Sequence, residues 1–130
     1  MTKFEFNSRD PIYLQLIAYF KREIVAGNIT PGQEFPSRRQ IARDFNINPN
    51  TVQRALHEME EKDWIFTEAN RPSRLSERTE IVQQIKDDFL QKTVDDFVDS
   101  IKTLDPDEDT VLSIIRASFK RKENGGNNDD

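Results

Sequence analysis

No cysteine occurs in the 130 residues of the chain. This absence excludes a disulfide framework and a thiolate metal site, and with them the class of small secreted scaffolds. No apolar run approaches the roughly 20 residues that a membrane-spanning helix needs. The opening MTKFEFNSRD also lacks the apolar segment of a signal peptide. We therefore expect a soluble, cytoplasmic protein made of one domain, or of one small domain with an appendage.

Residues that usually carry catalysis or phosphate binding are scarce as well. There are 4 glycines and 1 histidine, and no glycine-rich phosphate loop occurs. His57 lies in a helical pattern without a nucleophile beside it, which favours a groove-facing or solvated residue over a catalytic one. The acidic residues of a later helix lack the spacing of an EF-hand or another metal site; they are Asp87, Asp88, Asp95, Asp96 and Asp99. We expect no enzyme activity, no cofactor and no metal.

The charge of the chain is negative overall but unevenly distributed. The net charge is -5, yet residues 1–75 hold 11 Lys and Arg against 10 Asp and Glu, and residues 76–130 hold 8 against 14. Residues 36–54 are locally basic, with Arg38, Arg39, Arg43 and Arg54 opposed only by Asp44. A local patch of this kind decides whether a polyanion binds, although a solvated mixed surface would show the same charges.

Two helices are predicted in the first part of the chain. Asp10 as cap and Pro11 in the first turn suit a helix start. The apolar stripe that follows consists of Ile12, Tyr13, Leu16, Ile17, Phe20 and Ile24. A second start follows at Ser37, where a capping box would pair Ser37 with Gln40 in both directions. Ile41, Ala42 and Phe45 form the buried side of this second helix, and its three arginines point outward.

A third helix follows after one tight turn, within NINPNTVQRALHEMEE. Asn48 is a good N-cap and Pro49 a good first residue, so the start is sharply defined. The core stripe is Val52, Leu56 and Met59, whereas Asn50, Gln53, Arg54 and His57 lie on another face and three glutamates gather at the far end. The outer face thus changes from neutral and basic residues at the helix start to acidic residues at its end, which suits a helix whose first turns contact phosphates. An ordinary amphipathic surface helix is the alternative.

A small β-hairpin is predicted after the third helix. Residues 63–67 read as a strand, 68–73 as a turn in which Asn70 tolerates positive φ, and 74–76 as a return strand. Two helices joined by a tight turn and followed by a hairpin form the plan of a winged helix-turn-helix. The expected fold is thus mainly α with a small hairpin, and its DNA-binding domain covers residues 1–76.

The remaining residues form an appendage of two amphipathic helices, 77–121, followed by a tail, 122–130, that we expect to be disordered. Asp105-Pro106 separates the two helices. Their apolar surface exceeds what a 75-residue head can cover, which indicates a homodimer interface, unless the helices fold back on the head. The residues expected to make the interface are Ile81, Ile85, Phe89, Val94, Phe97, Ile101, Val111 and Ile115.

Three motifs of this chain carry a family resemblance. The opening PIYLQ, the segment PGQEFPSRRQIA and the segment NPNTVQRAL occur in this order and without gaps between residues 10 and 67. In this arrangement the chain resembles the DNA-binding domain of the GntR family of bacterial transcription regulators. The short two-helix C-terminal part is similar to the YtrA subfamily. The resemblance implies homodimers held by C-terminal helices, which commonly repress an operon with their own gene and an ABC transporter.

The same resemblance implies where DNA would be contacted. The family contacts fall on Arg39, Asn50, Thr51, Gln53 and Arg54, with Arg38 and Asn48 adjacent. Their chemistry agrees: Asn and Gln can pair with adenine, Arg with guanine or phosphate, and the helix start with phosphate. The wing departs from the family pattern, because Asn70 and Pro72 stand where glycines are usual and Glu68 where a basic residue is usual. Arg71 could still enter a narrow minor groove, yet we expect the wing to bind more weakly than a glycine-tipped one.

From the sequence we expect a sequence-specific transcription regulator, a homodimeric repressor that reads an inverted repeat in double-stranded DNA with residues 49–61 as recognition helix. The alternative is a winged-helix module that binds an acidic protein partner. A small-molecule effector, still unidentified, would have to bind between the head and the C-terminal helices, where Tyr13, Tyr19, Phe89 and Phe97 are aromatic candidates that suit a core equally well.

Overall fold

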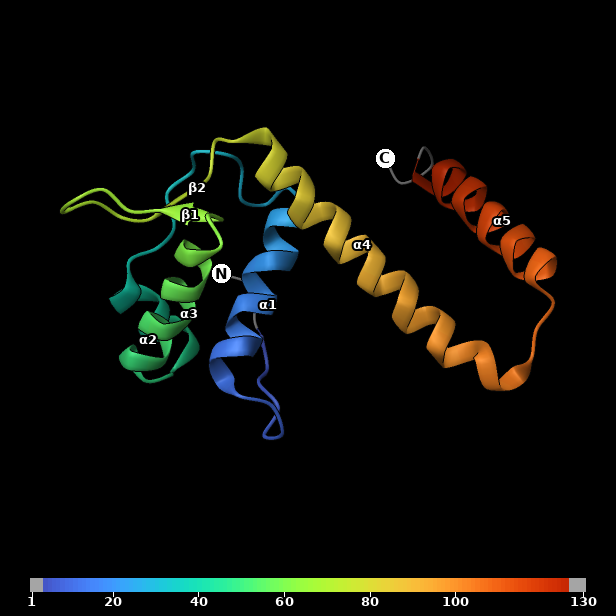
Figure 1. Cartoon of the computed structure of the whole chain (residues 1–130), viewed down its shortest axis with the longest axis horizontal. Helices are drawn as coiled ribbons and strands as arrows, with labels where there is room; N and C mark the ends of the chain where they lie inside the picture. The colour runs from blue at the N-terminus through green and yellow to red at the C-terminus, as the bar shows by residue number, and fades with distance from the viewer. Residues whose placement is uncertain (1–3, 127–130) are drawn as a thin grey trace. The chain divides into compact units, whose positions relative to one another are not determined.

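The computed structural model describes residues 4–126. The chain divides into two compact units, Met1–Gln91 and Lys92–Asp130. The elements are α1 (Ile12–Val25), α2 (Arg38–Phe45), α3 (Pro49–Glu61), β1 (Ile65–Phe66), β2 (Arg74–Leu75), α4 (Thr79–Ile101), a 3-10 helix (Lys102–Leu104) and α5 (Glu108–Gly126) (Figure 1). The expected fold class, mainly helical with one small hairpin, is confirmed.

The first unit is built around α3, which lies between α1 and α2 (Figure 1). The apolar stripe of each helix meets in one core, to which both strands and the first turns of α4 also contribute. Its fully buried large side chains are Leu16, Phe20, Ile24, Ile41, Val52, Leu56, Met59, Leu75 and Ile85. Since each such side chain contributes about 1.5–3 kcal/mol when removed from water, this core is what fixes the position of α3.

Local capping sets the start of α2 and of α3. The Ser37 hydroxyl accepts a hydrogen bond from the backbone N–H of Gln40 at 3.1 Å, as expected. The return half of the capping box is wrong, because the Gln40 amide donates forward to Asp44 at 2.8 Å. Asn48 caps α3 by accepting from the N–H of Asn50 at 2.8 Å, and Pro49 is the first helical residue, as predicted.

The start of α1 differs from the expectation. Pro11, not Asp10, precedes the first helical residue, and no side chain caps this end. The Asp10 carboxylate instead accepts from the Asn7 amide at 3.2 Å. The buried Gln15 amide donates to the carbonyl of Asp10 at 2.8 Å and to that of Asn7 at 3.1 Å. The N-terminal segment is therefore held against α1 by Gln15, a contact that replaces capping.

The hairpin is short and receives a third partner. β1 and β2 are antiparallel, with Ile65 opposite Leu75 and Phe66 opposite Arg74. Arg74 also forms a bridge with Glu34, in the segment before α2. Asn70 adopts φ 62 in the connecting loop, which confirms the expectation of a left-handed residue there. The strands thus fix the base of the wing, and the loop 67–73 extends from it (Figure 1).

α3 ends in a left-handed residue that is not glycine. Asp63 has φ 61, its N–H donates to the carbonyl of Glu60 at 2.9 Å, and the N–H of Trp64 donates to that of Met59 at 3.0 Å. This pair of bonds is the Schellman motif, whose left-handed position favours glycine. At this positive φ the Cβ atom of an L-residue is too close to the following carbonyl oxygen, which is energetically unfavourable. Asp adopts this conformation more readily than most other residues with a Cβ.

Replacing Asp63 with glycine is expected to raise the free energy of unfolding by about 1 kcal/mol, because glycine adopts positive φ without that steric cost. Urea unfolding followed by circular dichroism at fixed protein concentration measures the difference. Asp63→Ala is the control, since it removes the carboxylate but keeps the Cβ, and it should give no gain. Equal gains in both variants would mean that the carboxylate, not the backbone conformation, costs the stability.

α4 begins in the first unit and continues into the second. Val82 and Ile85 on its first turns are buried in the core of the first unit, so this unit extends beyond the expected domain end at residue 76. Glu80 lies in the first turn. A hydrogen bond from its own backbone N–H, followed by one from Arg78, holds the pKa of Glu80 below its ordinary value.

The second unit contains the rest of α4, the 3-10 helix and α5. Asp105, at φ 46, ends the first helical segment before Pro106, so the predicted break is confirmed. An apolar groove of about 490 Å³ lies in this unit, lined by Val94, Phe97, Val98, Ile101, Lys102, Asp105, Pro106, Glu108, Val111, Leu112 and Ile115. Of the tail expected at 122–130, residues 122–126 belong to α5 and the rest lies outside the described residues. No helix of the described chain is long and apolar enough to cross a bilayer.

Candidate nucleic-acid interface

The outer face of α3 presents hydrogen-bonding side chains on its first two turns. Asn50, Gln53 and Arg54 are exposed and Thr51 is half-buried. No acidic residue lies in the first turn, and the amide N–H of Asn50 is bound by the cap residue Asn48. The positive end of the helix dipole therefore coincides with neutral and basic side chains, an arrangement that suits an anionic partner.

A hollow of about 380 Å³ lies beside this face, where the starts of α1 and α3 meet. It is lined by Ile12, Tyr13, Asn48, Asn50, Thr51 and Arg54, none of which is acidic. The guanidinium carbon of Arg54 lies 3.8 Å from the centroid of the Tyr13 ring. The helical periodicity places Tyr13 in the buried stripe of α1, and no pattern in the sequence indicates that it also supports this surface.

The negative charge of α3 is confined to its far end. Glu61 Oε1 lies 3.0 Å from His57 Nε2, and Glu60 pairs with Arg38 at 3.0 Å. The first carboxylate of α3 is that of Glu58. It lies more than two turns from Asn50 along the helix, roughly 12 Å at 1.5 Å per residue. The helix therefore presents a favourable surface to a polyanion only at its start.

Arg38 and Arg39 are neighbours in sequence with different surroundings. The Nη2 group of Arg38 donates to Glu60 Oε1 at 3.0 Å, and this same oxygen accepts from the Thr67 hydroxyl at 2.7 Å. The Thr67 hydroxyl also lies 2.6 Å from that of the buried Ser73. Arg38 therefore joins α2 to α3 and to the base of the wing, whereas Arg39 is exposed and no ion pair or hydrogen bond involves its guanidinium within residues 4–126.

Arg38→Ala is expected to lower the free energy of unfolding by about 1 kcal/mol, because it leaves the half-buried Glu60 carboxylate without its cation and removes the packed stem. Arg39→Ala is the matched control, and as an exposed substitution it should stay within about 0.5 kcal/mol of the unsubstituted protein. Urea unfolding of the two variants tests the difference. Equal losses would show that the Arg38–Glu60 pair does not stabilise the fold.

The wing brings one further arginine near the start of α2. Arg71 is exposed and lies 3.9 Å from Glu68, a pair so solvated that it contributes little. A second hollow, of about 260 Å³, is lined by Pro36, Ser37, Arg38, Asn70, Arg71, Pro72 and Ser73. Arg71 is therefore near the capped start of α2, although Asn70 and Pro72 replace the glycines expected at this tip.

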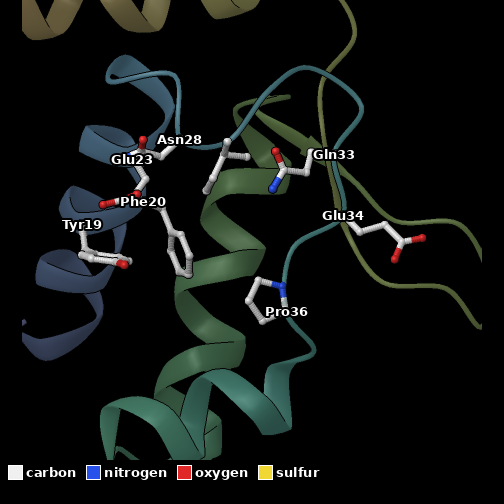
Figure 2. Close-up of a pocket in the computed structure, with 8 residues that line it drawn as sticks. Tyr19, Phe20, Glu23, Asn28, Gln33, Glu34 and Pro36 are labelled. Carbon is white, nitrogen blue, oxygen red and sulfur yellow. The ribbon is translucent and has the colours of Figure 1, made fainter. Parts of the chain in front are cut away.

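A third pocket, of about 200 Å³, is lined by none of the residues predicted to contact DNA (Figure 2). Figure 2 shows its lining side chains on α1 and its end, among them Phe20 and Glu23, and on the segment before α2, among them Glu34 and Pro36. Two carboxylates and no basic residue line it, so it does not suit nucleic acid. Within the described residues there is also no cluster of His, Cys, Asp and Glu that could hold a metal ion.

Of the residues expected at the dimer interface, five line the apolar groove of the second unit: Val94, Phe97, Ile101, Val111 and Ile115. Phe89 is half-buried on α4 within the first unit. Ile85 is 1% exposed and Ile81 packs against the same core, so the first unit already uses the surface of both. Further apolar side chains of the second unit are exposed, among them Leu104 at 74% and Phe119 at 68%.

Comparison with known proteins agrees with this geometry. Residues 12–75 match the family model described as bacterial regulatory proteins, gntR family. The chain is 32% identical over 112 residues to the uncharacterized HTH-type transcriptional regulator YhcF of Bacillus subtilis, covering 86% of this chain and 93% of that protein. It is 34% identical over 101 residues to the HTH-type transcriptional repressor YtrA of Bacillus subtilis, covering 73% of this chain and 78% of the relative.

A solved structure shares the fold along most of the chain. The GntR family transcriptional regulator from Listeria monocytogenes superposes with a TM-score of 0.79 at 28% identity, covering 86% of this chain and 98% of that one. These similar proteins are transcription regulators, so the expectation that the chain is not an enzyme is confirmed. The resemblance to the YtrA subfamily is confirmed as well. The chain therefore belongs to the gntR family of bacterial regulatory proteins and is a DNA-binding transcription regulator with a winged helix-turn-helix fold.

Proposed function

We propose that this regulator is a homodimeric repressor, acting in the cytoplasm, which reads an inverted repeat with α3 as recognition helix. The observation that carries the proposal is the outer face of α3, where Asn50, Gln53 and Arg54 are exposed and no carboxylate intervenes. Asn and Gln amides can form paired hydrogen bonds to adenine, and a planar guanidinium can do so to guanine. These three residues are the proposed base-reading set.

The remaining proposed contacts go to the DNA backbone. Thr51 and Asn48 lie at the capped start of α3, where the positive end of the helix dipole and the two polar side chains favour a phosphate. Arg39, exposed on α2, is the proposed main cationic contact there. Arg38 and Arg71 flank the same side, and the pairing of Arg38 with Glu60 leaves it fewer donors for DNA than Arg39 has.

The proposed dimer forms through the apolar groove of the second unit. Val94, Phe97, Ile101, Val111 and Ile115 would meet the same residues of a second copy, because a two-fold interface is self-complementary. Exposed side chains as large as Phe119 and Leu104 also favour burial against a partner. Two-fold symmetry of the protein requires two-fold symmetry of the operator, with half-sites related by about one helical turn or a multiple of it.

The repressor role rests on the name of the Bacillus subtilis relative, which is described as a transcriptional repressor. That the target is the operon of this chain's own gene, together with an ABC transporter, rests on the resemblance to the YtrA subfamily. Repression then follows from occupancy: a dimer on the promoter excludes RNA polymerase until it dissociates.

Selection from a library of randomised duplexes, with purified full-length protein as bait, tests the proposal. The expected result is enrichment of one palindromic sequence with two half-sites. Enrichment of a single, unrepeated half-site would contradict the proposal that the protein binds DNA as a dimer. Failure to enrich any sequence would contradict sequence-specific recognition.

A further inference from the structure

Tyr13 and Arg54 join the first turn of α1 to the second turn of α3. These two helices pack side by side (Figure 1). The guanidinium carbon of Arg54 lies 3.8 Å from the ring centroid of Tyr13, which is van der Waals contact with the face of the ring. Of the four cation–π contacts in the described residues, this one is the shortest by more than an ångström.

Tyr13 and Arg54 differ in how far the fold restricts their side chains. The Tyr13 ring is half-buried and packs against the core of the first unit, so its position is set by the fold. Arg54 is exposed, and within residues 4–126 its guanidinium forms no hydrogen bond and no ion pair. Arg38 and Arg74 differ in this respect, because carboxylates of Glu60 and Glu34 bind them at 3.0 Å and 2.7 Å.

An aromatic ring and a carboxylate affect the hydrogen-bond donors of an arginine side chain differently. A carboxylate occupies the N–H groups, whereas an aromatic ring covers only the face and leaves the N–H donors in the guanidinium plane available. Ordering a long side chain before binding also removes part of the conformational entropy that binding would otherwise cost. Tyr13 thus holds Arg54 without consuming its donors.

We infer that Tyr13 is a positioning residue for DNA recognition, which holds the Arg54 guanidinium over the hollow formed with Asn50 and Thr51 so that it meets a planar acceptor pair. The acceptor is the O6/N7 edge of guanine or the oxygens of a phosphate, since both match the guanidinium fork. This inference rests on the proposed DNA contact of Arg54. It adds a residue of α1, outside the helix-turn-helix itself, to the determinants of affinity.

Tyr13→Leu and Tyr13→Phe separate the ring from the hydroxyl. Leucine keeps an apolar side chain against the core but has no ring, and phenylalanine keeps the ring. The probe is the duplex that the unsubstituted protein enriches from a randomised library, measured by fluorescence anisotropy beside a scrambled duplex. We expect Tyr13→Leu to weaken binding about fivefold, the equivalent of about 1 kcal/mol at an exposed cation–π site, and Tyr13→Phe to stay within about twofold of the unsubstituted protein.

The pairing itself is tested by a double-mutant cycle with Arg54→Ala. If Tyr13 acts through Arg54, Tyr13→Leu should have no further effect once Arg54 is alanine. A loss confined to the selected duplex supports a guanine contact, and an equal loss on both duplexes supports a phosphate contact. An undiminished effect of Tyr13→Leu in the Arg54→Ala background would overturn the inference, as would a loss in Tyr13→Phe as large as that in Tyr13→Leu.

A second measurement does not depend on DNA or on the folding of any variant. In the free, unsubstituted protein, the Arg54 Hδ protons should resonate upfield of those of Arg39, because they lie near the face of the Tyr13 ring. Normal Arg54 shifts would overturn the inference even if a palindrome is enriched. Conversely, shifted Arg54 protons in a protein that enriches no sequence would leave the stack intact and contradict the proposed function instead.

Discussion

Phe97→Glu is expected to convert the protein to a monomer and to weaken binding to a palindromic operator by about 100-fold or more, since the gain from two linked heads is lost. Phe97 is 41% exposed and lines the groove that also holds Val94, Ile101 and Val111. A second copy seated there would bury the new carboxylate among apolar side chains without a partner, at a cost of several kcal/mol. Sedimentation equilibrium and anisotropy on the same sample measure both effects.

Ser113→Glu is the matched control for this substitution. Ser113 is exposed on α5 and does not line the groove, so the same added charge should leave both dimerisation and operator affinity near their original values. A dimer that persists in Phe97→Glu would show that the groove is not the interface. Loss of the dimer in both variants would mean that net charge, not the groove, controls association.

The double substitution Asn50→Ala with Gln53→Ala is expected to reduce discrimination between operator and scrambled duplex by roughly 2–6 kcal/mol, because each bidentate amide–base pair is worth about 1–3 kcal/mol. Both side chains are exposed on the first turns of α3, so the fold should be unaffected. Binding to the scrambled duplex should change little. The ratio of the two dissociation constants at one salt concentration is the quantity to measure.

Arg39→Ala provides the contrasting behaviour. If Arg39 contacts a phosphate, its loss should weaken binding to both duplexes by the same factor. The slope of log K against log salt concentration should also become shallower by about one unit. If the Asn50→Ala and Gln53→Ala substitutions also weaken binding to both duplexes equally, these side chains contact the DNA backbone, and α3 does not read bases through them. If Arg39→Ala leaves the salt slope unchanged, Arg39 does not meet a phosphate.

Features governed by neighbours in sequence were predictable from the sequence. The capping of α2 by Ser37 and of α3 by Asn48, the first-turn Pro49 and the left-handed Asn70 all depend on side chains reaching their own backbone within a few residues. The apolar stripes likewise gave the buried sides of the helices, because the 3.6-residue period depends only on local geometry. The order of the elements then indicated the winged helix-turn-helix.

Features decided by distant partners were not predictable in this way. The pairing of Arg38 with Glu60 joins residues 22 positions apart, and nothing in the local pattern separates Arg38 from Arg39. Ile85 has the spacing of the exposed stripe of α4, yet the core of the first unit covers it. In each case tertiary packing chooses between options that are equivalent in sequence.

Tyr13 illustrates the same limit at the candidate site. A tyrosine in the apolar stripe of a helix is most simply a core residue, and its ring does pack against the core. Its contact with Arg54 exists only because α1 lies beside α3. The candidate site of residues on α2 and α3 could thus be predicted from motifs, whereas its support from α1 required the packed structure.

Autoregulatory operator binding is tested by a fluorescence anisotropy titration of the full-length protein on the duplex upstream of its own gene, beside a scrambled duplex at the same salt. We expect binding to the upstream duplex at least about 1,000-fold tighter than to the scrambled one, saturating at two chains per duplex. Equal and weak binding to both duplexes would contradict an autoregulatory repressor that reads its operator with α3.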